Sequence, residues 1–475
     1  MAELRSVPIG DEQFVGSGAT ISVRSPWDGA ELGLVPKCGP QDVNRAVAAA
    51  KAAHDRGPLP PWRRAEILAK AARLLDERAE DFARMIAAEA AKPLKTARIE
   101  ARRAVSTLTF SAVAARTLCG EMVPVDAAQA GDGRLAFTLR LPVGVVGAIS
   151  PFNFPLNLVT HKVGPAIAAG CPVVLKPASA TPLTAIALAE LLLDECGLPA
   201  GHLNVVTGSG ATIGNTLVDH PDVAYVSFTG SGDVGWAIAE RASRTKVALE
   251  LGNSSPVVID ADGDWERAAG TISVAGFSHA GQSCVSTQRV YVHSSVADDF
   301  CAALAKTVGA LRVGDPLDAD TDVSALITSD DRDRVKAWVD EAVAQGARVV
   351  AGGEIVDGVL APTVLADVTP DMRVCRDEVF GPVVAVQAVA DVDEGLALAD
   401  DTRYGLQAGI YTARIDTALQ AAHRLHFGAV MINEVPTWRA DLMPYGGVRD
   451  SGNTKEGPAY AVREMTEERL VVIQP

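Results

Sequence analysis

A cysteine within a run of small residues is the side chain of this sequence best suited to covalent chemistry. The run is Gly281-Gln-Ser-Cys284, and it lies between a helix-like apolar stretch at 271–277 and a strand-like stretch at 287–293. A thiolate is a strong nucleophile near neutral pH, and a tight connection lets a backbone N–H point at the atom that the sulfur attacks. Because most free cysteines are buried apolar filler, Cys284 alone does not distinguish a nucleophile from a packing residue.

A glycine-rich turn provides a second chemical signal. Gly230, Gly232 and Gly235 form a G-x-G-x-x-G run that follows a strand and opens a helix expected over residues 236–243. Backbone N–H groups in such a turn can approach a pyrophosphate at the positive end of the helix dipole. A plain strand–helix turn has the same composition, so the motif alone leaves cofactor binding open.

Glu250 fits two different roles. It lies twenty residues after Gly230, where a dinucleotide-binding motif places the acid that binds the cofactor ribose. It also ends an apolar strand, where burial would raise its carboxyl pKa toward the range useful for a general base. The residues themselves leave both roles open.

Composition limits the classes of protein that can carry these groups. The 475 residues predict roughly two or three domains of ~150 residues each. The net charge of −16 argues against a nucleic-acid partner, and the absence of an apolar run of ~18 residues argues against a membrane span. Seven scattered cysteines without a C-x-x-C pair fit reduced thiols in a cytoplasmic enzyme, with no disulfide and no metal site.

The elements that must position these groups alternate between helix and strand. Helical periodicity is clear at 41–56, 61–80 and 181–195, where Thr181 is the expected N-cap and Gly197 the end. Near-continuous apolar runs indicate parallel strands that are buried on both faces. They occur at 145–149, 173–176, 203–207, 223–229, 247–251 and 256–259, and a second alternating region covers about 285–430.

Two further segments, 134–141 and 468–474, alternate apolar and polar residues outside the α/β regions. They predict half-exposed edge strands, which often pair with another subunit. The expected fold class is therefore α/β, with two Rossmann-like domains and a small β element for oligomerisation. Closed two-fold symmetry makes a homodimer or homotetramer the expected assembly.

Seven motifs together resemble the aldehyde dehydrogenase superfamily in their order and spacing, and they span nearly the whole chain. They are Pro151-Phe-Asn-Phe-Pro155, Lys176-Pro-Ala, Phe228-Thr-Gly-Ser231, Glu250-Leu-Gly, Gly281-Gln-Ser-Cys284, Glu378-Val-Phe-Gly-Pro382 and Pro444-Tyr-Gly-Gly447. The resemblance implies NAD(P)-dependent oxidation of an aldehyde to its acid. It also implies a dinucleotide-binding domain at 1–120 and 143–252, a catalytic domain at 253–452, and an oligomerisation element at 121–142 and 453–475.

The resemblance assigns the catalytic roles to three residues. Cys284 matches the nucleophile that forms a thiohemiacetal and then a thioester. Asn153 matches the amide that, with the backbone N–H of Cys284, holds the developing oxyanion. Glu250 matches the base that activates water, and its presence favours water over coenzyme A as the acyl acceptor. One departure is visible, because the family usually shows Glu-Leu-Gly-Gly and here Asn253 follows Gly252.

The resemblance also assigns the cofactor contacts. Glu378 matches the group that binds the nicotinamide ribose, Lys176 the one that reaches the adenosine ribose, and Ser231 a pyrophosphate contact. The remaining expected cofactor-site residues are Gly230, Phe152, Phe380 and Ser179. Where the family carries a glutamate, Ser179 removes its repulsion of a 2′-phosphate, so that Lys176 can pair with the phosphate and NADP is favoured over NAD. Alternatively, Ser179 only leads into the next helix.

For the substrate, position in the family places Asn157, His161 and Arg439 in the tunnel that admits the aldehyde. An amide, an imidazole and a guanidinium suit a small polar or anionic aldehyde. The structural alternative is that His161 satisfies a backbone carbonyl and Arg439 forms a salt bridge. Residues 431–439 and 445–452 are similar to the lactaldehyde dehydrogenase-like branch, near which lie semialdehyde and glyceraldehyde-3-phosphate oxidisers.

Two rival functions remain at this point. One is a catalytically silent relative with a structural or binding role, against which the presence of Cys284, Glu250 and Asn153 argues. The other is a cofactor-independent cysteine esterase, which would need a histidine as base. None of the eight histidines lies in a recognisable partner motif.

Overall fold

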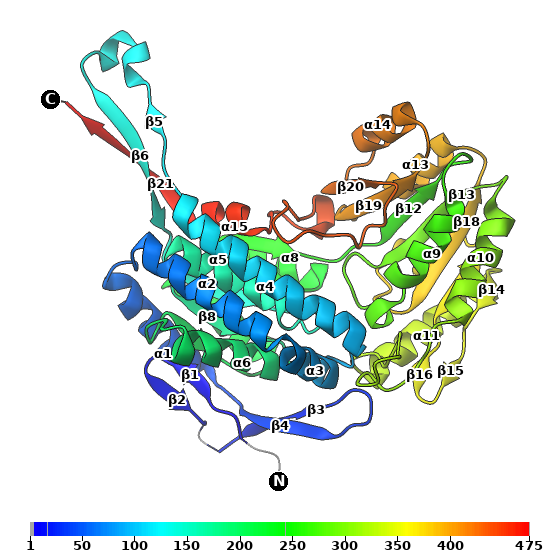
Figure 1. Ribbon diagram of the computed structural model, residues 1–475, viewed down its shortest axis with the longest axis horizontal. Coiled ribbons are helices and arrows are strands. Elements are labelled where there is room, and N and C mark those ends of the chain that lie inside the picture. Colours follow the sequence, from blue (N-terminus) through cyan, green and yellow to red (C-terminus); the bar gives the residue numbers. More distant parts are fainter. Residues whose placement is uncertain (1–3, 17, 243, 475) are drawn as a thin grey trace.

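The computed structural model describes residues 4–16, 18–242 and 244–474 (Figure 1). Two mainly parallel sheets, each packed with helices, form the body of the molecule, and a narrow antiparallel ribbon projects from it. This arrangement confirms the expected α/β class with two parallel sheets and a small β element. Within the described ranges, no helix is both long and apolar enough to cross a bilayer.

The first sheet is fully parallel. Its strand order is β11 (Lys246–Glu250), β10 (Val223–Thr229), β7 (Val145–Ile149), β8 (Val173–Lys176) and β9 (Leu203–Val205). The three strands β7, β8 and β9 are buried along their whole length, which explains their continuous apolar runs. Register pairs Ile149 with Lys176 and Thr229 with Glu250, so the carboxyl ends of these strands meet at one edge.

Helices from both ends of the chain pack on the first sheet. Among them, α5 is buried on every side, and α4 contacts α2, α3 and α5. The helices are α1 (Pro40–Asp55), α2 (Pro61–Glu77), α3 (Ala79–Ala90), α4 (Leu94–Thr117), α5 (Asn157–Ala169), α6 (Leu183–Glu190), α7 (Asn215–Val218), α8 (Gly232–Arg241) and α15 (Pro458–Glu464).

Three helix expectations need correction. The helix expected at 61–80 is two helices, because Arg78 leaves the helical region between α2 and α3. The helix expected from Thr181 begins after Pro182, since the Thr181 hydroxyl donates to the Phe152 carbonyl instead of capping, and its last turn at 191–195 is a π-helix. The helix expected at 236–243 begins at Gly232 and ends at Arg241, and Ser243 lies outside the described residues.

The second sheet has seven strands. Their order is β14 (Arg348–Ala351), β17 (Thr363–Ala366), β18 (Val383–Val389), β13 (Thr287–His293), β12 (Ser255–Ile259), β19 (Gln407–Tyr411) and β20 (Ala429–Ile432). Only the β14–β17 pair among these is antiparallel. The local pattern groups the strand at 256–259 with the first alternating region, whereas the family resemblance puts it in the segment 253–452. In the structure it lies inside the second sheet, between β13 and β19. Its partners β13 and β19 come later in the sequence, so local pattern could not reveal them.

Helices and short loops complete this half of the molecule. The helices are α9 (Trp265–Ala275), α10 (Ala297–Gly309), α11 (Ser329–Ala344), α12 (Arg373–Arg376), α13 (Val392–Asp400) and α14 (Ile415–Arg424).

Short antiparallel pairs form at β15 (Ile355–Val356) with β16 (Val359–Leu360), and near the N-terminus at β1 (Val7–Ile9) with β2 (Glu12–Phe14) and β3 (Thr20–Arg24) with β4 (Glu31–Pro36).

The projecting ribbon joins two segments that are far apart in sequence (Figure 1). Strand β21 (Thr466–Ile473) pairs antiparallel with β6 (Leu135–Pro142) over eight residues, and β5 (Met122–Val123) extends the other side of β6. The two expected edge strands therefore pair with each other. The ribbon keeps exposed apolar side chains on all three strands, namely Met122, Leu135, Leu139, Leu470, Val472 and Ile473.

Candidate active site

A cavity of about 180 Å³ lies where the first sheet's helices meet the loop that leads into β13. Helix α4 contributes Arg103 to its wall and helix α5 contributes Asn157. Cys284 lines the cavity from the loop between α9 and β13, and Arg439 and Tyr445 line it from the segment before α15. The cavity therefore collects polar side chains from four separate parts of the chain.

Backbone conformation fixes the loop that carries Cys284. His279, Ala280 and Gly281 have φ values of 52°, 52° and 69°, so the chain makes a left-handed turn that ends three residues before the cysteine. A Cβ at Gly281 would lie 2.1 Å from the carbonyl oxygen of Gly381, so only glycine fits there. The turn delivers the half-buried Cys284 to the cavity, whereas Cys119 is exposed and the other five cysteines are buried.

The Cys284 thiol lies in a setting that disfavours its ionisation. Burial raises the pKa of the thiol to about 12, and the nearby Glu378 carboxyl acts in the same direction. Two groups act in the opposite direction and lower the pKa of the thiol. They are the Tyr445 hydroxyl, which lies 2.9 Å from Sγ, and the Arg439 guanidinium. Among the described residues, these two groups are the ones that favour the thiolate.

Asn153 lies beside the cysteine loop. It follows β7 at the carboxyl edge of the first sheet, and its buried Nδ2 donates a 2.9 Å hydrogen bond to the carbonyl oxygen of Gln282. An amide nitrogen carries two hydrogens, so a second N–H remains beside the loop of Cys284. The structure thus brings together Asn153 and the cysteine segment as the sequence predicts, while the oxyanion role itself remains a prediction.

Glu250 is a buried carboxyl group with no hydrogen-bond partner on either oxygen. It is the last residue of β11, and burial together with the neighbouring Glu456 carboxyl raises its pKa well above the usual range. A Cβ at Gly446 would lie 2.6 Å from Glu250 Oε1. Glu250 therefore lies against the same segment that brings Tyr445 to Cys284, and a raised pKa suits a group that must take up a proton.

The departure at Asn253 leaves Glu250 in place. The Asn253 side chain is buried and donates to the Ser255 hydroxyl at 2.8 Å and to the Gln407 carbonyl at 3.0 Å. Its backbone N–H donates to Glu378 at 3.1 Å. The Asn253 side chain therefore anchors the segment between β11 and β12 to the second sheet. A glycine at this position could not make these side-chain hydrogen bonds.

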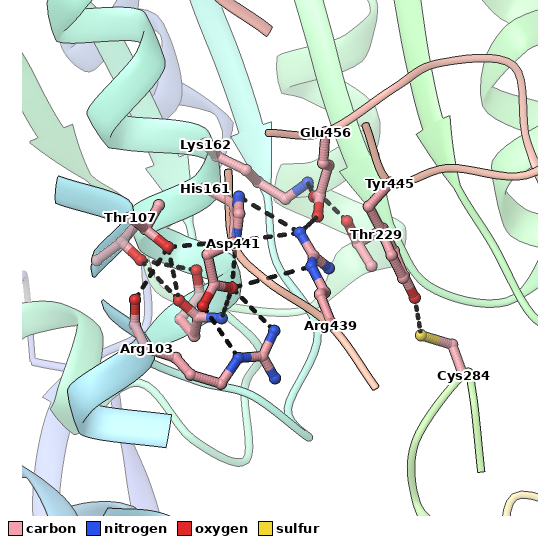
Figure 2. Close-up of polar contacts among 12 residues, drawn as sticks. Arg103, Thr107, His161, Lys162, Thr229, Cys284, Arg439, Asp441, Tyr445 and Glu456 are labelled. Carbon is pink, nitrogen blue, oxygen red and sulfur yellow. Dashed lines mark hydrogen bonds and ion pairs between the residues drawn. The ribbon is translucent and has the colours of Figure 1, made fainter. Parts of the chain in front are cut away.

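A network of buried charges lies behind the cavity wall (Figure 2). Arg439 donates to Glu456 at 3.0 Å, and the same nitrogen lies 3.0 Å from His161 Nε2. Asp441 accepts from Arg103 at 2.8 Å and lies 3.0 Å from His161 Nε2. The bonds from His161 and Arg103 hold the pKa of the Asp441 carboxyl well below its usual range, so Asp441 is ionised near neutral pH.

The three residues expected to line the substrate tunnel have different positions. Asn157 lines the cavity, but its amide nitrogen donates to Asp441 at 3.0 Å and its oxygen accepts from Thr107 at 3.0 Å. His161 is buried and does not line the cavity, and its Nε2 lies 3.0 Å from both Asp441 and Arg439 (Figure 2) instead of binding a backbone carbonyl. Arg439 both forms a salt bridge with Glu456 and lines the cavity. Among the described residues its buried Nε has no hydrogen-bond partner, and the Asp441 carboxylate lies 3.8 Å from it.

The expected adenosine-side contacts lie at the carboxyl edge of the first sheet. Lys176 ends β8, its Nζ donates to the Pro177 carbonyl at 3.1 Å, and burial lowers its pKa to about 8. Ser231 precedes α8, and its side chain makes no capping hydrogen bond. Gly230 donates its N–H to the Glu250 carbonyl, and the Ser179 hydroxyl donates to the Gly208 carbonyl at 2.8 Å.

The expected nicotinamide-side contacts lie next to the cysteine loop. Burial raises the pKa of Glu378 to about 7, and a Cβ at Gly252 would lie 2.2 Å from its Oε2. The rings of Phe152 and Phe380 meet edge to face with centroids 5.9 Å apart. The Lys176 ammonium and the Ser231 hydroxyl lie at the edge of the first sheet, and the Glu378 carboxyl group lies near the cysteine. This order of groups fits a dinucleotide with phosphates at one end and a ribose at the other.

The sequence alone did not identify several residues of the site. Tyr445 belongs to the motif Pro444-Tyr-Gly-Gly447, and its place in that motif was the one signal in the sequence that could have pointed to it. Arg103, Asp441, Glu456 and Lys162 carry charge in segments without any motif, and only the folded chain brings them together. In the described parts of the chain, no group of three or more histidine, cysteine or acidic residues could hold a metal ion.

Comparison with known proteins places these features in a family. The model of the aldehyde dehydrogenase family matches residues 14–471. A 3-sulfolactaldehyde dehydrogenase of Priestia aryabhattai is 47% identical over 444 residues, 94% of this chain and 92% of the relative. A lactaldehyde dehydrogenase of Methanococcus aeolicus is 36% identical over 457 residues, 95% and 97% of the two chains. The NADP complex of a glyceraldehyde-3-phosphate dehydrogenase from Bacillus halodurans C-125 superposes with a TM-score of 0.96, 36% identity and 99% coverage of both chains.

Proposed function

Because this chain belongs to the aldehyde dehydrogenase family and is an NAD(P)-dependent oxidoreductase, we propose that it oxidises a short aldehyde with an anionic group to the carboxylic acid. The observation that carries the proposal is the convergence of three groups on the cysteine segment. Cys284 lines the cavity together with Arg439, Asn153 donates to the carbonyl of Gln282 in the cysteine loop, and Glu250 lies against Gly446, next to Tyr445. A nucleophile, an amide donor and an unpartnered carboxyl group are the parts that acyl chemistry through a thioester requires.

The residues perform the reaction in a fixed order. Cys284 Sγ adds to the aldehyde carbon, and the Asn153 amide with the backbone N–H of Cys284 stabilises the oxyanion of the thiohemiacetal. NAD(P), when bound, accepts the hydride that leaves this carbon. Glu250 then takes a proton from water, which attacks the resulting thioester, releases the acid and returns the thiol. A raised carboxyl pKa prepares Glu250 for that step.

Cofactor choice depends on the adenosine end of the site. Lys176 supplies a cation, and Ser179 in place of a carboxylate leaves room for a second negative charge beside it. NADP is therefore the preferred cofactor in this proposal, with NAD as the alternative. Solved relatives of the same fold include one complexed with NADP and one described as NAD-dependent, so the choice rests on Lys176 and Ser179.

Substrate class depends on the guanidinium groups in the cavity wall. Among the described residues the buried Nε of Arg439 has no hydrogen-bond acceptor, since Asp441 lies 3.8 Å away. Arg103 lines the same cavity, and its Nε and one terminal nitrogen bind Asp441. An anionic group on the aldehyde would supply the missing acceptor. The name of the Priestia relative, a 3-sulfolactaldehyde dehydrogenase, is consistent with a sulfonate. A carboxylate or phosphate has the same hydrogen-bonding chemistry.

The esterase alternative is not favoured. Such an enzyme needs a base beside the thiol, and the contact of the Cys284 sulfur in the structure is the Tyr445 hydroxyl. A silent binding protein would not require Cys284, Asn153 and Glu250 together at the cysteine segment. We also propose that the protein is cytoplasmic and forms a homodimer or homotetramer. In this proposal residues 1–120 and 143–252 bind the cofactor, residues 253–452 carry out catalysis, and residues 121–142 and 453–475 join the subunits.

The test is a panel of short aldehydes with purified enzyme and each cofactor, followed by absorbance of the reduced cofactor. We expect 3-sulfolactaldehyde, succinate semialdehyde and glyceraldehyde 3-phosphate to give higher kcat/KM than neutral lactaldehyde and propanal. Cys284→Ala is the control and should abolish turnover. Equal kcat/KM for neutral and anionic aldehydes would reject the substrate class, and ester hydrolysis without any cofactor-dependent turnover would reject the dehydrogenase.

A further inference from the structure

The hydroxyl of Tyr445 lies 2.9 Å from the Sγ of Cys284 in the cavity wall (Figure 2). We propose that Tyr445 is a positioning residue whose hydroxyl holds the Cys284 sulfur and stabilises the thiolate that attacks the aldehyde. The inference rests on the proposed role of Cys284 as nucleophile and extends it to a residue that has no place in the reaction described above.

Backbone contacts hold Tyr445 in this position. Its N–H donates to the Glu456 carbonyl at 3.1 Å, and the Glu456 N–H donates back at 2.6 Å. The ring is 3% exposed and packs with Val285 and Leu406. Because neither backbone nor ring is free to move, the hydroxyl has a fixed place from which to orient the sulfur.

The direction of the hydrogen bond follows from the chemistry of the two groups. A phenol is a strong donor, whereas a thiol is a weak donor and a thiolate can only accept. Tyr445 therefore donates, and its bond becomes stronger when Cys284 loses its proton. This donation acts against the burial that raises the pKa of Cys284.

The charges that face the sulfur explain why such a donor is needed. Glu250 at the end of β11 and Glu378 after α12 disfavour a thiolate, and Arg439 favours it. Arg103 and His279 also line the cavity. The Arg439 guanidinium lies 3.7 Å from the centroid of the Tyr445 ring. A cation over an aromatic face makes the phenol more acidic, so Arg439 acts on the sulfur partly through Tyr445.

The first experiment compares Tyr445→Phe with the wild-type enzyme. Iodoacetamide alkylation of Cys284, quantified by mass spectrometry of its peptide, reports the thiolate population from about pH 7 to 9. Losing a hydrogen bond to a charged sulfur should slow alkylation about tenfold across this range. The matched control is Tyr460→Phe, since Tyr460 is an exposed tyrosine on α15, and its rate should equal that of the wild type.

Two further variants test the mechanism of the effect. Fluorotyrosine at position 445 keeps the shape of the ring and makes the phenol a stronger donor, so alkylation should become faster. Arg439→Met should slow alkylation, and it should slow it less in the Tyr445→Phe background than in the wild type, because part of the effect of Arg439 passes through the hydroxyl. Aldehyde kcat/KM should fall about tenfold in Tyr445→Phe while the KM for NADP stays constant.

Alkylation profiles that are identical in the wild type and Tyr445→Phe would overturn the proposal, because a ring that only fills space has the same effect with or without its hydroxyl. Thermal unfolding of each variant shows whether the fold is retained, and the fluorotyrosine enzyme gives an answer in the opposite direction. The alkylation needs neither aldehyde nor cofactor. A wild-type enzyme that oxidises no aldehyde would therefore reject the proposed function separately from the role of Tyr445.

Discussion

The amide nitrogen of Asn153 donates a 2.9 Å hydrogen bond to the carbonyl oxygen of Gln282. Asn153 follows β7 of the first sheet, and Gln282 lies in the loop that precedes β13 of the second sheet. The bond therefore ties the two sheets together two residues before Cys284. Any change in how the two halves pack would move the oxyanion donor relative to the nucleophile.

Glu250→Gln should stop the reaction after hydride transfer. The thioester forms, but water is not activated, so we expect a burst of about one reduced cofactor per subunit and a steady state at least about a hundredfold slower. Rapid-mixing absorbance measures both phases. If Glu250 bound the cofactor ribose instead, the variant would show a higher KM for cofactor and no burst.

Ser179→Glu should move the preference from NADP toward NAD. A carboxylate placed beside the 2′-phosphate costs about 1–3 kcal/mol, or about one to two decades in the NADP/NAD ratio of kcat/KM. Ser179→Ala is the control, since it removes the bond to the Gly208 carbonyl without adding charge. An unchanged ratio in Ser179→Glu would show that the 2′ position is read by other residues.

The preference for NADP should weaken as pH rises through the pKa of Lys176. Burial lowers this pKa to about 8, so the ammonium is charged below that pH and neutral above it. Loss of the charge removes the attraction to the 2′-phosphate, and the KM for NADP should rise up to about tenfold one unit above the pKa. The KM for NAD should stay flat, and Lys176→Arg should abolish the dependence. Parallel pH profiles for the two cofactors would contradict this assignment.

Arg103→Met should reduce the discrimination between anionic and neutral aldehydes. Removing a guanidinium from the cavity wall should lower the ratio of kcat/KM for succinate semialdehyde over propanal by about tenfold. Arg102→Met is the matched control, because Arg102 is its exposed neighbour on α4. A ratio that changes equally in both variants would mean that the cavity arginine does not contact the substrate.

Deleting residues 468–475 should weaken both the fold and the assembly. The deletion removes the pairs between β21 and β6 from Glu468 to Ile473 and the exposed apolar residues of that strand. We expect a lower Tm and a smaller oligomer by light scattering. Val472→Ser keeps the strand and removes one apolar side chain, and Glu467→Ser is its polar control. An intact wild type that is monomeric at micromolar concentration would disprove the subunit contact.

The sequence determined the fold class and the chemistry of the site. Buried parallel strands show as apolar runs because both faces lie against helices, and the nucleophile motif is local because a tight turn needs Gly281, three residues before Cys284. The lining of the cavity was decided by the tertiary structure. Arg103 meets Asp441 across 338 residues of sequence, and Cys284 meets Tyr445 across 161, and no local pattern records such contacts.

The tertiary structure also decided which predicted residues face the cavity and which support it. His161 and Arg439 look equivalent in the sequence, yet burial places His161 behind the guanidinium that lines the cavity. Strand β12 joined the second sheet for a related reason, since its partners follow it in the chain. Residue type and spacing determine what chemistry is available, whereas packing between distant segments determines where each group points and how its pKa is shifted.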